Sequence, residues 1–390
     1  MDATGSKNEL ATVVQRFGRG LMEKQPLNAV QVKALHNILQ CRTAVMGGHE
    51  QVCTHCGEKS YSYNSCGDRH CPKCQKGKQA LWIEKVTRLA LPVKHFHIIF
   101  TVPHHLNRVC LWNPSMYYNL LFSALWRTLH SFGYSHFGAE TGAIAVLHSW
   151  GQNLSLHPHI HCIVPAAGYS LKGKWKRIGN QKYLYPVHQL SATFKGKFLD
   201  SLKRKLKTLG KPEAFNADIQ QSYNTPWVVF SEASMAGPEH VIAYLGQYTH
   251  RVAISNDRIR DISKTHVRFI TKDYRDRGRQ KPVSLTGVEF LRRFCQHVFP
   301  KGFVRIRRFG IYHPTTIRSM GLQFTTEEEI PQPKQQTVKQ TIHAEAHQLA
   351  GFDPGICQKC KKGRLVVVAE LPRIRSPATS LPALIKSMVL

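Results

Sequence analysis

Two Cys-x-x-Cys pairs near the N-terminus constrain the fold of this chain more than any other feature. The pairs, Cys53/Cys56 and Cys71/Cys74, are separated by fourteen residues, and pairs spaced in this way typically place four thiolates around one zinc ion. Buried free cysteines are the alternative, but two such pairs rarely occur at this spacing by chance. Because four thiolates form a closed site, the pattern predicts a structural zinc site whose metal stabilises a small module.

Other potential ligands lie between these pairs and far along the chain. Cys66 and His70 could each replace one of the four thiolates. A third pair, Cys357/Cys360, lacks a second cysteine pair, but His343 and His347 lie four residues apart and could complete a site of two cysteines and two histidines. The alternatives for that region are a solvated helix and a loose pair of thiols.

The charge of the chain indicates the class of its partner. Over 390 residues, 54 Lys and Arg against 24 Asp and Glu leave a formal charge of +30, while 42% of the residues are apolar. That apolar share is enough for the cores of two or three domains. An excess of positive charge this large is explained most simply by a polyanion, and nucleic acid is the first candidate.

The remaining composition predicts a cytoplasmic protein without a membrane role. The first ten residues have no apolar targeting core, and the uncharged run 109–126 contains Asn113 and Pro114, unlike a membrane span. Eleven cysteines in a reducing compartment favour metal binding over a disulfide framework.

Hydrophobic periodicity predicts a mixed α+β fold built around an antiparallel sheet. The boundaries predicted are a helical N-terminus plus zinc module (1–90), a catalytic domain (91–320), and a linker and tail (321–390). Expected strands are 94–103, 143–150, 159–164, 227–231, 266–271 and 303–312. Expected helices lie within 1–45 and at 79–91, 115–132, 195–209, 238–251 and 286–298, the last one capped by Thr286 and Glu289.

A His-x-His motif is the first candidate for catalytic chemistry. In a strand, His159 and His161 share one face, so two imidazoles are offered to one divalent ion. His95 and His97 repeat the pattern, so alternation alone does not separate a metal site from ordinary histidines. With His157 added, the run also fits the H-x-H-x-H signature of histidine triad nucleotide hydrolases.

Two tyrosines are the second candidate. Tyr244 and Tyr248 lie four residues apart, so on a helix both hydroxyls project from one face. Such a pair is usually core packing. Residues 251–310, however, carry 16 Lys and Arg against 5 Asp and Glu, a net +11, which would attract a phosphate backbone. The predicted DNA contacts are His250, Arg251 and Arg258.

Four blocks occurring in one order identify a family resemblance. They are NSCGDRHCPKCQ, KHFHIIFTVPHHLN, SWGQNLSLHPHIHCIVPAAG and YLGQYTHRVAISNDRI. From about Cys53 to Tyr312 the chain resembles the insertion sequence 91 family of HUH transposases. The resemblance implies an HUH endonuclease-like domain after a zinc-binding domain. It makes His159 and His161 the ligands of Mg²⁺ or Mn²⁺, and Tyr244 and Tyr248 the paired nucleophiles, and it leaves His95 and His97 outside the site.

The activity implied is cleavage and transfer of single-stranded DNA through 5′-phosphotyrosine intermediates in rolling-circle transposition, with no nucleotide cofactor. The third metal ligand stays open among His157, Gln152 and Gln247. Three other functions compete: a zinc-containing DNA-binding protein without catalysis, a rolling-circle replication initiator or relaxase, and the histidine triad hydrolase. The hydrolase explains neither the cysteine pairs nor the charge.

Overall fold

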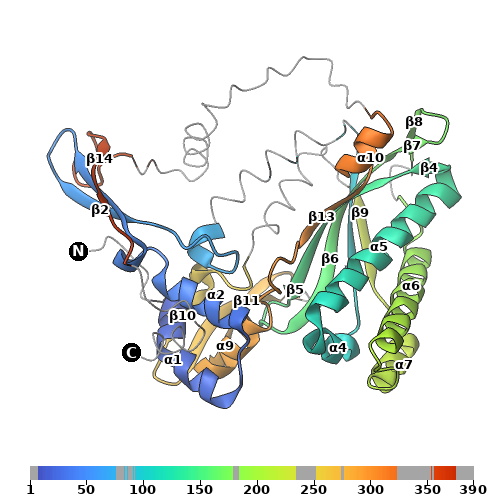
Figure 1. The fold of residues 1–390 in the computed structure, drawn as a ribbon, viewed down its shortest axis with the longest axis horizontal. Helices are drawn as coiled ribbons and strands as arrows, with labels where there is room; N and C mark the ends of the chain where they lie inside the picture. The colour runs from blue at the N-terminus through green and yellow to red at the C-terminus, as the bar shows by residue number, and fades with distance from the viewer. Residues whose placement is uncertain are drawn as a thin grey trace.

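The computed structural model describes residues 8–75, 83, 86, 91, 93–178, 184–233, 252–273, 276–322, 353 and 355–374. Its centre is a five-stranded antiparallel sheet in the order β13-β5-β6-β3-β9 (Figure 1). The antiparallel sheet predicted from the sequence is thereby confirmed. The strands of this sheet are β3 (His95–Thr101), β5 (Gly142–Trp150), β6 (Leu156–Pro165), β9 (Val229–Ala233) and β13 (Ile306–Gly310).

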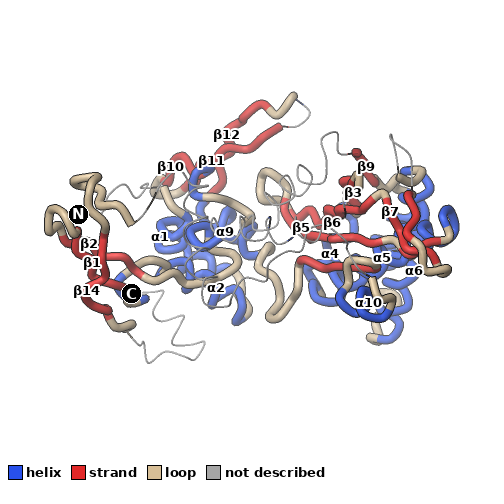
Figure 2. The backbone as a smooth tube through the Cα atoms, turned by 90° about the horizontal axis from the view of Figure 1, so that it is seen from above, coloured by secondary structure: helices blue, strands red, loops and turns tan. Residues whose placement is uncertain are grey.

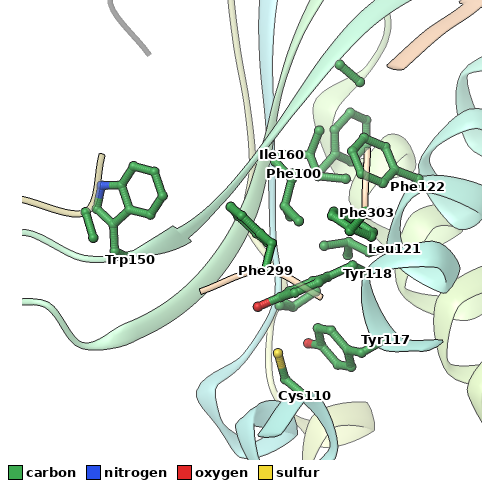
Figure 3. Packing of buried hydrophobic residues seen from close by; sticks show 14 of the residues in the cluster. Phe100, Cys110, Tyr117, Tyr118, Leu121, Phe122, Trp150, Ile160, Phe299 and Phe303 are labelled. Atoms are coloured by element: carbon green, nitrogen blue, oxygen red, sulfur yellow. The ribbon is translucent and has the colours of Figure 1, made fainter. Parts of the chain in front are cut away.

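One face of this sheet forms the main hydrophobic core. Alternate residues such as Phe100 and Ile160 are fully buried beneath α5 (Pro114–Phe137) and α6 (Val187–Thr208), which cover this face (Figures 1 and 3). Phe100 meets Phe194 of α6 edge to face at 5.0 Å between ring centroids. Because side chains alternate across a strand, the residues between these apolar ones project from the other face of the sheet.

A second unit combines segments from both ends of the first three hundred residues. The helices α1 (Leu10–Lys24) and α2 (Ala29–Gln40) pack with α9 (Gly287–Cys295) and the antiparallel sheet β10-β11-β12 (Figure 1). At Gly287 an added Cβ would lie 2.2 Å from the Phe17 ring, so only glycine allows this approach. The strands are β10 (Ile259–Ile262), β11 (His266–Asp273) and β12 (Arg279–Thr286).

A small three-stranded sheet joins the two ends of the chain. Its order is β14-β1-β2, with β1 (Gly48–Cys53) in the centre, β2 (Lys59–Tyr63) on one side and β14 (Leu365–Leu371) on the other. The predicted division into 1–90, 91–320 and 321–390 follows the chain, whereas the folded units cross these boundaries. The Thr286 cap is present, its hydroxyl accepting from the Glu289 amide at 3.4 Å.

The other described elements complete these units. They are η1 (Ala44–Met46), η2 (His104–Leu106), α4 (Asn107–Trp112), β4 (Ala139–Glu140), β7 (Ala167–Ser170), β8 (Trp175–Arg177), α7 (Asn216–Asn224), η3 (Asn256–Arg258) and α10 (Pro314–Ser319). The predicted helix 238–251 and the predicted linker lie outside the described residues. None of the helices in the described ranges is long and apolar enough to cross a membrane.

Candidate functional sites

Three histidines converge on the sheet face opposite the helices. His159 and His161 come from β6, and His148 comes from the adjacent strand β5, where it stands directly opposite His159. One ring nitrogen from each lies within 4.8 Å of the others. The two histidines predicted from the sequence therefore share a site with a third that sequence reasoning missed. The available signal was His148 within an expected strand, but strand register is not visible in the sequence.

Hydrogen bonds orient two of these rings. Nδ1 of His159 donates to the carbonyl oxygen of His157 at 2.7 Å, which leaves Nε2 as the atom with a free lone pair. Nδ1 of His161 lies 2.9 Å from Nε2 of His97, and the two rings are stacked at 5.2 Å with 4° between their planes. When Nδ1 of His161 carries the proton and donates it to Nε2 of His97, Nε2 of His161 keeps its lone pair on the side of the ring away from His97. Partners of this kind fix the tautomer of a metal-binding histidine.

Burial keeps the imidazoles of His159 and His97 neutral. It lowers the pKa of His159 to about 4 and that of His97 also to about 4. Neutral imidazole is the form that binds a metal ion, so the three converging rings fit a divalent cation. An all-nitrogen set suits transition-metal ions better than Mg²⁺, whose preferred ligands are oxygens.

The other predicted ligands lie elsewhere or outside the described residues. His157 has an exposed side chain and is not part of the three-histidine group. Gln152 accepts a hydrogen bond from Arg258 through its backbone oxygen, and Gln247 is not described. His95 contacts the Tyr312 hydroxyl at 2.7 Å instead.

The predicted nucleophiles and most of the predicted DNA contacts are not described. Tyr244, Tyr248, His250 and Arg251 lie outside the described residues. Arg258 is described, and its guanidinium donates to the backbone oxygens of Ile270, at 2.8 Å, and Gln152. These bonds join β11 to the loop that precedes β6, and a DNA contact by Arg258 stays a prediction.

The cysteines form two separate groups, so the predicted single site is wrong. Each group brings four sulfur atoms within 4.8 Å of one another. The first cluster contains Cys41, Cys66, Cys71 and Cys74, and the second cluster contains Cys53, Cys56, Cys357 and Cys360. The predicted pairs are separated because β2, which lies between them in the sequence, pairs with β1 and leads the chain away from the first pair.

The remaining ligands of both clusters come from positions that the spacing did not indicate. Cys66, predicted only as a spare ligand, completes the first cluster together with Cys41, which follows α2 directly. The sulfur atoms of Cys41 and Cys66 each lie 3.5 Å from that of Cys74. His70, the other spare candidate, bonds Asp68 at 2.9 Å.

The C-terminal pair has different partners from those predicted. The sulfur of Cys360 lies 3.6 Å from that of Cys53, and the sulfur of Cys357 lies 3.8 Å from that of Cys56. The pair is therefore completed by cysteines rather than by His343 and His347, which lie outside the described residues. Backbone N–H groups of Gly363 and Lys362 lower the pKa of Cys360 to about 6, as a thiolate ligand requires.

Comparisons with known proteins divide the chain into a zinc-binding region and a second region that contains most of the five-stranded sheet. Residues 13–102 match a family model described as "Transposase zinc-binding domain", and residues 142–319 match one described as "Putative transposase". A relative from Sinorhizobium fredii (strain NBRC 101917 / NGR234), "Putative transposase y4qJ", is 36% identical over 386 residues, which cover 95% of this chain and 97% of the relative.

A second relative carries a more specific name. The "Transposase for insertion sequence element IS801" of Pseudomonas savastanoi pv. phaseolicola is 26% identical over 309 residues, covering 74% of this chain and 72% of that protein. No solved structure matches the chain. These matches define a transposase, a DNA-processing enzyme, with an N-terminal zinc-binding domain. Within that class, the chain belongs to the insertion sequence 91 family of transposases.

Proposed function

We propose that this transposase cuts and rejoins single strands of DNA in rolling-circle transposition, using an HUH-type site. The observation that carries the proposal is the convergence of His148, His159 and His161 on one face of the sheet. Three imidazoles directed at one point, with His97 holding the ring of His161, are what a catalytic metal site needs. Ordinary packing of a sheet face does not require such a convergence.

The three histidines would hold a divalent ion that acts as a Lewis acid on the scissile phosphate. The nucleophile in this proposal is the phenol oxygen of Tyr244 or Tyr248. As the new O–P bond forms, the bond from phosphorus to the 3′ oxygen breaks, leaving a 5′-phosphotyrosine and a free 3′ hydroxyl, while the phenol proton is lost and the 3′ oxygen gains one. The exchange conserves bond energy, so no nucleotide cofactor is needed.

Two nucleophiles suit strand transfer better than simple cleavage. One tyrosine keeps the first cut end while the other opens a second strand, and the free 3′ hydroxyls then attack the phosphotyrosine links. A phenol, with a reference pKa of about 10, becomes reactive beside positive charge, and the basic segment 251–310 follows the two tyrosines directly in the sequence.

The competing functions account for fewer observations. A zinc-containing DNA-binding protein without catalysis leaves the three-histidine group unexplained. The histidine triad hydrolase requires His157, whereas the described group contains His148 in its place. A replication initiator or relaxase would share the chemistry, but the chain belongs to a transposase family.

The test uses labelled single-stranded DNA carrying the ends of the element, with Mn²⁺ or Mg²⁺ added. The wild type should form a covalent adduct, and peptide mapping should locate it at Tyr244 or Tyr248. The double variant Tyr244→Phe with Tyr248→Phe should fold, bind DNA and form no adduct, because only the hydroxyls are removed. An adduct on any other residue would overturn the nucleophile assignment.

Matched histidine variants test the metal group. His148→Ala, His159→Ala and His161→Ala should each abolish the adduct yet retain DNA binding, since basic side chains supply most of the affinity. His157→Ala is the control, because its exposed ring lies two residues from His159 and outside the group. Loss of the adduct in His157→Ala but not in His148→Ala would show that the third ligand is His157.

A further inference from the structure

The second cysteine cluster joins parts of the chain that are about three hundred residues apart. Cys53 is the last residue of β1 and Cys56 follows it, while Cys357 and Cys360 precede β14. The sulfur contact of Cys53 with Cys360 spans 307 positions of the sequence, and that of Cys56 with Cys357 spans 301. The match to the zinc-binding domain covers residues 13–102, which include all four thiols of the first cluster and only half of the second. The C-terminal half of this site therefore lies outside any zinc-binding region that the comparisons recognise.

The two clusters share no sulfur atom and are each complete with four. A tetrahedral set of four cysteine thiolates is the closed arrangement of structural zinc. Backbone amides also point at the sulfurs of the second cluster: the His55 amide lies 3.4 Å from Sγ of Cys53, and the Gly363 amide lies 3.4 Å from Sγ of Cys360. Such N–H···S bonds stabilise thiolates over thiols, so the geometry suits a bound cation.

Gly363 shows how closely the two halves fit together. An added Cβ at this position would lie 2.4 Å from Sγ of Cys53 and 2.6 Å from Cβ of His55. The loop that carries Cys360 can approach Cys53 this closely only because Gly363 has no side chain. The contact is therefore a specific fit between distant segments and places both thiol pairs around one point.

Without a metal, the other described contacts of the C-terminal segment would hold it only weakly. β14 pairs with β1 from Leu365 opposite Cys53 to Leu371 opposite Gly48, but its side chains cover almost no core. Val366, Val367 and Val368 have exposed fractions of 49%, 49% and 57%. The ion pair of Lys359 with Glu58, at 2.6 Å, is exposed, and exposed ion pairs contribute little to stability.

We propose that the chain binds two zinc ions, and that the ion in the second cluster is a clasp that fastens the C-terminal segment 355–374 to the N-terminal module. In small modules the binding of structural zinc supplies much of the free energy of folding, far more than the exposed contacts of β14 provide. When the metal leaves, β14 detaches from β1, whereas the first cluster keeps its own ion. The clasp is independent of the DNA cleavage proposed above.

The experiment counts zinc by native mass spectrometry of the full-length chain and follows β14 by hydrogen exchange. The wild type should carry two zinc ions. The double variant Cys357→Ser with Cys360→Ser should carry one, and the amides of β14 and of the β1 edge facing it should lose protection while those of α1 and α2 keep it. The reciprocal variant Cys66→Ser with Cys71→Ser should lose the other ion.

Gln358→Ala is the matched control, because this exposed residue lies between the two C-terminal cysteines and its amide contacts only the Ile356 carbonyl within the described structure. It should retain both ions and full protection. One zinc ion in the wild type, or two in the Cys357→Ser, Cys360→Ser variant, would overturn the second site. Loss of one ion with unchanged protection of β14 would overturn the clasp.

Discussion

At the scale of single residues, metal binding by the histidine group depends on which ring nitrogen of each imidazole is unprotonated. His97 does not belong to the group, yet its Nε2 lies 2.9 Å from Nδ1 of His161. The resemblance to a known family left His97 outside the site, and the structure gives it a supporting place directly behind a proposed ligand. Such supporting bonds typically change metal affinity about 10–100-fold when they are lost.

His97→Ala should therefore weaken Mn²⁺ binding about 10–100-fold without removing any of the three imidazoles. His97→Gln should restore part of the affinity, because its side-chain oxygen can accept the same hydrogen bond. The measurement is a titration of free Mn²⁺ by electron paramagnetic resonance. His95→Gln is the control, since His95 bonds Tyr312 instead. Equal weakening of Mn²⁺ binding in His97→Ala and in His95→Gln would argue against a positioning role for His97.

The lowered pKa of the buried His297 side chain should make the stability of the protein depend on pH. Nδ1 of His297 lies 3.2 Å from Oγ of Ser149 and its Nε2 lies 3.1 Å from the Leu154 carbonyl, and burial lowers its pKa from 6.5 to about 4. Between these values the unfolded chain binds a proton that the folded chain does not. The free energy of unfolding should thus fall as the pH drops from 6.5 toward 4, by up to about 1.4 kcal/mol per pH unit for this group.

Urea unfolding of the wild type and of His297→Gln at pH 7 and pH 5 tests this expectation. The variant should lose less stability between the two pH values, because one group with a depressed pKa is absent. The other buried histidines titrate alike in both proteins, so the difference in slope isolates His297. Identical slopes would mean that its protonation does not oppose folding.

Single residues also show where sequence reasoning succeeds and where it ends. Alternation along one strand was enough to predict that His159 and His161 share a face, because that depends only on local backbone geometry. His148 and Cys41 were missed, because their partners are set by strand register and by the packing of α2. No spacing within the sequence encodes those distances.

At the scale of elements, the basic side chains of segment 251–310 fall into two groups. Some are buried or paired with acidic residues, and others are exposed to solvent. Arg292 and Arg293 pair with Glu289 at 2.5 and 2.7 Å, and Arg305 is buried. The hairpin of β11 and β12 differs. It projects away from α1 and α9 (Figure 2), and its outer face presents Arg268 and Lys272, which are exposed on alternate positions. The net charge of the sequence alone could not separate these two groups.

Replacing Arg268 and Lys272 with Gln should weaken DNA binding and lower the salt slope of log K by about 1.5, since each phosphate contact contributes about 0.7–0.9. The pair Arg279→Gln and Lys281→Gln is the control. It removes the same charge, but Lys281 already pairs with Asp273 at 2.8 Å and Arg279 with Asp276 at 4.0 Å. Filter binding across a series of salt concentrations provides the slopes. Equal losses in both double variants would contradict a specific role for the outer face.

The elements themselves were largely predictable, whereas their pairing was not. Strands expected at 143–150 and 266–271 correspond to β5 and β11. Residues 143–147 of β5 are a short continuous apolar run, and the first residues of β11 alternate between polar and apolar, and both patterns are typical of strands. The strand order β13-β5-β6-β3-β9 depends on contacts between segments far apart in the chain. The same holds for β14, which joins β1 across most of the sequence.

At the scale of the whole molecule, hydrogen bonds connect the first cysteine cluster to the core beside the five-stranded sheet. Arg69 and His70 directly precede Cys71. The guanidinium of Arg69 donates to the Phe303 carbonyl, and Nε2 of His70 accepts from the Phe299 amide at 3.2 Å. Both phenylalanines pack against Tyr118 of α5, with ring centroids 5.8 and 5.4 Å away (Figure 3). Two hydrogen bonds thus connect the first cluster to the segment that precedes β13 and packs against α5.

Arg69→Ala should therefore uncouple the zinc-binding module, which carries the first cysteine cluster, from the five-stranded sheet. The zinc content should stay unchanged. The Phe303 carbonyl loses its donor in a partly buried place, which costs about 1–3 kcal/mol, and urea should then unfold the two units in separate steps. Arg42→Ala is the control, because Arg42 donates to the Lys73 carbonyl at 3.2 Å within the module. It should preserve a single transition. If Arg42→Ala and Arg69→Ala unfold alike, the bond from Arg69 to the Phe303 carbonyl does not couple the zinc-binding module to the five-stranded sheet.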